Sequence, residues 1–237
     1  DGTDYFDGKT IFPEEFYRIQ ADGADIKTYH INQYMFRENF EPYAKAGDEV
    51  LYLCFSTGIA GTFNAANLAK EELLEEYPDF KLTILDTKCA SLGFGLVVEK
   101  VLQMQENGAP KELIIEAAQY FCDHMEHIVT VETLEYLYKG GRLSRTSAVL
   151  GGVLDVKPII EVNDEGALVA FEKVRGRHKS LKRCVELVGE RGVELDKQII
   201  GVVHGNDPKT CEQVCEVLME KYHCRGIIKS WVGCAIG

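Results

Sequence analysis

The sequence lacks the features that define several large protein classes. No apolar run in its 237 residues approaches the roughly 20 residues that a helix needs to cross a bilayer, so an integral membrane protein is excluded. Positive charge is scarce, and the formal net charge of −12 argues against nucleic acid as the main partner. A Walker phosphate loop, a G-x-G-x-x-G fingerprint and a C-x-x-C pair are all missing. Kinase, dehydrogenase and zinc-ribbon functions are therefore disfavoured.

The composition is that of a soluble globular chain, because 46% of the residues are hydrophobic and 27% are charged. The length favours two lobes, since single cores commonly divide into units of about 100 to 150 residues. The eight cysteines are scattered and mostly lie in apolar contexts. This distribution predicts reduced, structural thiols in a cytoplasmic protein. The chain begins with neither a Met nor a signal peptide, so its ends need not be those of the natural protein.

Residues 1–125 carry the pattern of a parallel α/β lobe. The continuous apolar run 50–55 predicts a central strand, and the helical pattern 63–77 follows it after a Gly-rich turn. The strand signal returns at 82–86 and leads into another helix, so two strand-turn-helix units follow each other. Earlier in the lobe, Pro42 predicts a kink or an early end in a helix expected over 33–47.

Residues 126–237 indicate an α+β lobe with a mostly antiparallel sheet. KPIIEV and ALVAFEKV, separated by a turn at 163–166, predict a hairpin. A helix from Leu181 to Arg191, a buried strand IIGVVHG and a helix over 208–222 complete this lobe. The fold class expected is thus α/β, with the lobe boundary near residue 125.

The turn from Phe55 to Thr62 is the most informative stretch of the sequence. The hydroxyls of Ser56 and Thr57 stand at the carboxyl end of the expected strand, and the glycines allow backbone N–H groups to approach a ligand. Such a turn suits an anion. An equally good explanation is that both residues only cap the next helix.

Two other chemistries have weaker support. A nucleophilic Ser56 would need the elbow G-x-S-x-G, but Cys54 occupies the place of the first glycine. A metal site at His124 and His127 is disfavoured because no thiolate or third ligand stands nearby. His204 follows an apolar strand and precedes a helix, where a partly buried structural histidine and a functional one are both plausible.

Several of these junctions resemble, in their order and spacing, the DegV family of bacterial fatty-acid-binding proteins, the acyl-carrying subunits of fatty acid kinase. The resemblance spans nearly the whole chain. The segments that carry it are FSTGIAGTFNAA, LDTKCASLGFG, ETLEYLYKGGRLS, VLDVKPII, EKVRGRHK and GVVHGND.

The resemblance implies a carrier without catalytic activity or cofactor, which binds a long-chain fatty acid between two lobes. The carboxylate would lie on hydroxyls and the tail in an apolar tunnel. The head-group set that the family pattern transfers to this chain is Thr28, Ser56, Thr57, His204 and Arg142. The alternative function is a lipid hydrolase or acyltransferase that uses Ser56 and His204.

The same resemblance implies a cytoplasmic partner, a separate kinase subunit that phosphorylates the fatty acid for phospholipid metabolism. The basic stretch 173–183 could dock that partner through Arg175 and Arg177.

The chain departs from the family pattern in several places. It reads Tyr29-His30-Ile31 where the family has Ser-Gln-Pro, and Ala60 stands where a serine is usual. We expect the chain to lack the family's first strand unit and its closing segment.

Overall fold

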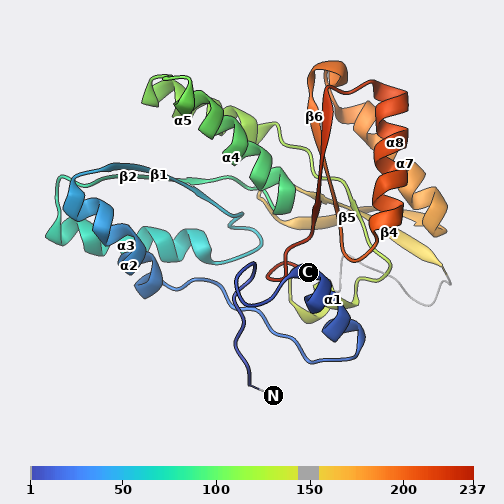
Figure 1. Ribbon diagram of the computed structural model, residues 1–237, viewed down its shortest axis with the longest axis horizontal. Coiled ribbons are helices and arrows are strands. Elements are labelled where there is room, and N and C mark those ends of the chain that lie inside the picture. The colour runs from blue at the N-terminus through green and yellow to red at the C-terminus, as the bar shows by residue number, and fades with distance from the viewer. Residues whose placement is uncertain (1, 144–154) are drawn as a thin grey trace. The chain divides into compact units, whose positions relative to one another are not determined.

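A computed structural model describes residues 2–143 and 155–237. Ser144 and the pair 153–154, which belong to two of the DegV-like motifs, lie outside the described residues. The helices and strands follow one another along the chain as shown in Figure 1: α1 (Pro13–Ala21), α2 (Gln33–Ala46), β1 (Glu49–Cys54), α3 (Thr62–Glu76), β2 (Lys81–Asp86), α4 (Ser91–Glu106), α5 (Lys111–Asp123), β3 (Val129–Thr130), α6 (Glu135–Lys139), β4 (Val156–Val162), β5 (Leu168–Arg175), α7 (Arg177–Arg191), η2 (Leu195–Lys197), β6 (Ile199–His204), α8 (Pro208–Tyr222) and β7 (Gly226–Trp231).

The chain divides into two compact units. The first combines Asp1–Tyr29 with Leu181–Gly237, and the second is His30–Ser180. The lobe boundary expected near residue 125 falls inside the second unit, so this grouping differs from the division into 1–125 and 126–237. The reason is that the two ends of the chain pack together, as the 3.1 Å hydrogen bond from Tyr17 Oη to the Val232 carbonyl illustrates. Local sequence patterns carry no signal for such a contact.

The second unit contains the predicted parallel α/β arrangement. Strands β1 and β2 pair in parallel from Glu49 opposite Lys81 to Cys54 opposite Asp86. Alternate side chains point to opposite faces of this sheet. Figure 1 shows α2 and α3 on one side of β1 and β2, and α4 and α5 on the other. Both faces are therefore covered, which explains the continuous apolar run of β1.

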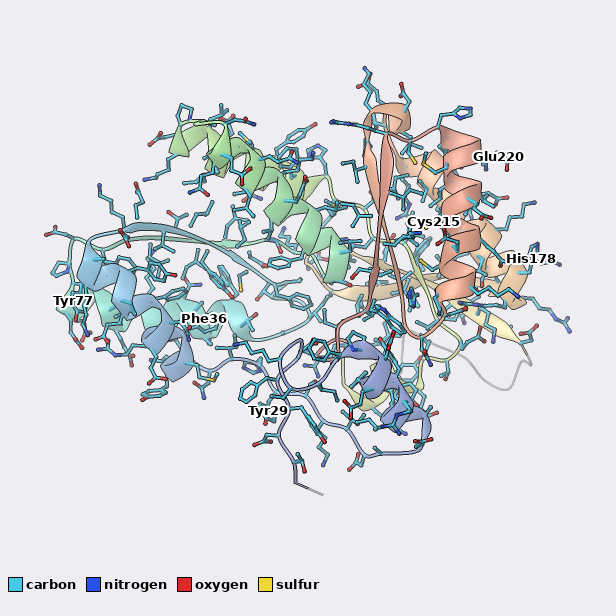
Figure 2. The ribbon with its side chains drawn as sticks, viewed as in Figure 1. Tyr29, Phe36, Tyr77, His178, Cys215 and Glu220 are labelled. Atoms are coloured by element: carbon cyan, nitrogen blue, oxygen red, sulfur yellow. The ribbon has the colours of Figure 1, made fainter. Side chains whose placement is uncertain are left out.

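Two apolar clusters fill these faces. Phe36, labelled in Figure 2, packs from α2 with Ala66 of α3 and Leu82 of β2. On the other face, Leu85 of β2 packs with Val97 of α4 and residues of α5. These clusters fix the ends of β1 and β2, from which the candidate site extends.

The predicted hairpin is confirmed. Strands β4 and β5 pair antiparallel, and β3 adds to the other edge of β4 to give the order β3-β4-β5. In the turn, Asn163 Oδ1 accepts the N–H of Ala167 at 2.8 Å, and Gly166 adopts a φ of +76°. Such a conformation favours glycine because a side chain would be strained there.

The first unit contains a second parallel pair, β6 and β7, joined through α8. Strand β6 was expected to be buried, but its residues from Ile199 to His204 are all only partly buried. Its single neighbour among the described strands is β7. Strand β7 was not predicted from the sequence, because Lys229 and Ser230 interrupt its apolar pattern.

One helix keeps its expected limits, and another begins earlier than expected. Helix α2 continues through Pro42 to Ala46 and ends at Gly47, which has a left-handed φ of 73°, so an early end was a wrong expectation. Helix α7 begins at Arg177, earlier than the expected start at Leu181. Within residues 2–143 and 155–237, no cysteine forms a disulfide. In the described part of the chain, no helix is long and apolar enough to span a membrane.

Candidate functional site

Ser56 ties the turn after β1 to the turn of the β4-β5 hairpin. Its side chain is fully buried, and Ser56 Oγ donates a 2.6 Å hydrogen bond to the Gly166 carbonyl. The same oxygen accepts the N–H of Gly58 at 3.3 Å. Because the single hydroxyl hydrogen is used in this contact, Ser56 has a structural role in the observed geometry.

Two glycines allow these turns to approach each other. A Cβ atom at Gly58 would lie 2.4 Å from the carbonyl carbon of Gly166. A Cβ atom at Gly166 would lie 2.3 Å from Ser56 Oγ. Neither distance leaves room for a side chain, so both positions require glycine.

Thr57 differs from its neighbour because its side chain is exposed. Its backbone N–H donates to Asp86 Oδ1 at 3.1 Å, and the same carboxylate oxygen accepts the N–H of Lys88 at 3.1 Å. Asp86 thus fixes the backbone of both strand-end turns. These bonds fix the backbone of Thr57 and leave its side chain exposed.

Further hydrogen bonds join the ends of β1 and β2. Thr87 Oγ1 donates to the Cys54 carbonyl at 2.7 Å, and the N–H of Ser56 donates to the Cys89 carbonyl at 3.1 Å. Burial raises the pKa of the Cys54 thiol, so this group stays neutral. The contacts between the two strand ends are therefore made by neutral groups and the Asp86 carboxylate.

Arg142 reaches the same turn from the segment after α6. Its Nε donates to the Ile59 carbonyl at 3.2 Å, and the side chain is exposed. Of the five residues in the predicted head-group set, Ser56, Thr57 and Arg142 thus lie in or contact the turn after β1.

The other two predicted ligands belong to the first unit. His204 ends β6, and its Nδ1 accepts the N–H of Asp207 at 3.2 Å. A neutral His204 ring therefore carries its hydrogen on Nε2. The ring lies 4.4 Å from the Trp231 ring, between centroids. Thr28 lies in an exposed segment before α2.

The basic stretch 173–183 spans the end of β5 and the start of α7. Arg175 is exposed, whereas Arg177 Nε pairs with Glu132 Oε1 at 3.0 Å and Arg183 pairs with Glu190 at 2.6 Å. His178, labelled in Figure 2, is exposed near the start of α7. The stretch is thus partly neutralised by glutamates, and Arg175 is the more accessible of the two predicted docking residues.

His127 stabilises the start of α4. Its Nε2 accepts the N–H of Ala90 at 3.2 Å, and the ring lies where a Cβ atom of Gly93 would be. Burial lowers the pKa of His127. Within 2–143 and 155–237, the structure places no His, Cys, Asp or Glu residues in a group suited to a metal ion.

Three residues outside the predicted head-group set lie at or against the turn after β1: Asp86, Gly166 and His30. The position of Asp86 at the end of an apolar strand could have indicated a role at the carboxyl edge of the sheet. The sequence indicated that Gly166 belongs to a turn, but it did not indicate the contact between Gly166 and Ser56. His30 lies beside Gly61, a contact between segments that only the fold creates.

Comparison with known proteins identifies the family. A family model described as "Uncharacterised protein, DegV family" matches residues 1–237. A DegV domain-containing protein of Clostridium perfringens is 37% identical over 239 residues, which cover 100% of this chain and 82% of that protein. The chain therefore belongs to the DegV family.

Solved structures agree with this assignment. The fatty acid binding DegV family protein SAG1342 from Streptococcus agalactiae is 29% identical, with a TM-score of 0.86 over 100% of this chain and 82% of that one. A stearic acid-binding protein from Eubacterium ventriosum is 25% identical, with a TM-score of 0.81 over 94% of this chain and 77% of that one. The mixed α/β fold with parallel and antiparallel sheets is thus that of the DegV structures.

Proposed function

We propose that this protein binds a long-chain fatty acid and holds its carboxylate at the turn after β1. The observation that carries the proposal is the arrangement of the exposed Thr57 hydroxyl and the Arg142 guanidinium on one turn. Both are donors suited to a carboxylate. The fatty acid binding described for the two solved relatives supports the same ligand class.

The ligand's tail would supply most of the affinity. Burial of an acyl chain is worth about 0.8 kcal/mol per methylene, so about fifteen methylenes give about 12 kcal/mol before the cost of association. The head-group donors then serve to orient the ligand. The position of the tail, and a ligand role for Thr28 and His204, stay predictions from the family resemblance.

The contacts of Ser56 favour a carrier over the alternative serine hydrolase. Its hydroxyl hydrogen is donated to the Gly166 carbonyl, whereas a nucleophilic serine donates to a base. Ser56 would then contribute to binding by holding Thr57 in place. A fluorophosphonate probe should leave the protein unlabelled, and covalent labelling of Ser56 would support the hydrolase.

We also propose that a separate cytoplasmic kinase subunit phosphorylates the bound fatty acid after docking near Arg175. Arg175 is the better position at which to test docking, because Arg177 already pairs with Glu132. Arg175→Glu should reduce kinase-dependent phosphorylation while fatty acid binding is retained. Lys197→Glu on η2 is a charge-matched control.

The binding test uses the protein as purified. Native mass spectrometry should detect a bound fatty acid, and the delipidated protein should take up oleate. Thr57→Val removes the hydroxyl with little change in shape and should weaken oleate binding about tenfold. A protein that is purified empty and does not take up oleate or palmitate would contradict the proposal.

A further inference from the structure

His30 lies against the same Gly-rich turn as Arg142. A Cβ atom at Gly61 would be 3.3 Å from His30 Nε2 and 3.5 Å from its Cε1. The nitrogen-bearing edge of the ring therefore faces the turn that connects Thr57 to α3. The His30 side chain is also exposed, so the ring can contact a bound molecule.

The packing of α2 on α3 fixes this contact. Asn32, two residues after His30, caps α2 by accepting the N–H of Met35 at 2.9 Å. From α2, Phe36 and Phe40 then pack in one cluster with alanines of α3. Because α3 begins directly after Gly61, the two helices set the distance between His30 and the turn.

Arg142 approaches the turn at another residue, through Ile59. The segment from Thr57 to Gly61 thus has a guanidinium at its middle, an imidazole at its end and an exposed hydroxyl at its start. Each of these groups can donate a hydrogen bond to an anion.

We propose that His30 is a specificity-determining residue, which donates a hydrogen bond to the head group and favours a carboxylate over an uncharged head group. The inference rests on the proposed function, because it assigns His30 to the same ligand. It adds a group that the head-group set predicted from the sequence does not contain.

The test compares oleate with oleyl alcohol, which has the same chain length but no charge. In the delipidated protein, His30→Ala should weaken oleate binding about tenfold and leave oleyl alcohol binding unchanged. His30→Gln, which retains a donor, should recover part of the oleate affinity. His124→Ala is the matched control, because His124 is an exposed histidine at the end of α5 whose Nδ1 lies 2.8 Å from the Tyr120 carbonyl oxygen.

Each outcome decides the inference. Unchanged oleate binding by His30→Ala would overturn it, and so would an equal loss for both ligands. If the unaltered protein binds neither ligand, the proposed function itself is refuted. If the unaltered protein binds oleate and His30→Ala binds it equally well, only the role of His30 is refuted. A thermal melt checks that each variant is folded.

Discussion

Ser56 Oγ donates a 2.6 Å hydrogen bond to the carbonyl oxygen of Gly166, a residue 110 positions further along the chain. The bond joins the turn of a parallel α/β layer to the turn of an antiparallel hairpin. The serine of this bond is buried, whereas the neighbouring Thr57 is exposed.

Ser56→Ala should lower the free energy of unfolding by about 1–3 kcal/mol, because the Gly166 carbonyl loses its buried donor. Urea denaturation measures the change. Thr57→Ala is the adjacent control, and its exposed side chain should change stability by about 0.5 kcal/mol or less. Equal stabilities for the two variants would show that the bond to Gly166 contributes nothing.

Gly58→Ala should destabilise the protein by about 1–3 kcal/mol, because the added methyl meets the backbone of Gly166 and forces the two turns apart. Gly95→Ala in α4 is the matched control. There the new Cβ would meet only Leu92 Cδ1 at 3.4 Å, so helix propensity should raise stability by up to about 1 kcal/mol. Thermal or urea unfolding of the two variants checks whether Gly58→Ala lowers stability and Gly95→Ala raises it.

Asp86→Ala should weaken oleate binding about tenfold, because Thr57 and Lys88 lose the acceptor that fixes their backbone. Asp86→Asn keeps a carbonyl oxygen at that position and should retain most of the affinity. Titration of both delipidated variants with oleate makes the comparison. Normal binding by the alanine variant would show that Thr57 needs no support from Asp86.

Stability should fall in mild acid because of His127. Burial lowers the pKa of this histidine from 6.5, so below that pH the unfolded chain takes up a proton that the folded chain does not yet bind. The contribution of His127 to the free energy of unfolding is therefore complete above pH 6.5. It declines as the pH falls toward the pKa of His127 in the folded protein.

Urea unfolding at about pH 7.5 and about pH 5.5 measures this effect, and His127→Gln should reduce the difference between the two conditions. His124→Gln changes an exposed histidine and should leave the difference as in the unaltered protein. If the unaltered protein and both variants show the same pH dependence of stability, that dependence comes from groups other than His127.

Much of the fold could be predicted from local pattern. Asn32 and Gly47 mark the limits of α2, and the apolar runs around Leu51 and Leu85 mark β1 and β2. The hairpin followed from two strand patterns around a turn that ends at Gly166. The partial burial of β6 could not be predicted, because its apolar run gives no information on how many strands lie beside it.

The sequence by itself determined the local elements, the chemistry of the turn after β1 and, through its ordered motifs, the DegV family. Only the tertiary structure decided which hydroxyl of the Ser56–Thr57 pair is buried, which residues face Gly61 and how the two chain ends join in one unit. The physical reason is distance along the chain. Capping, periodicity and turn formation depend on neighbours in sequence, whereas the Ser56–Gly166 and His30–Gly61 contacts depend on how separate elements pack.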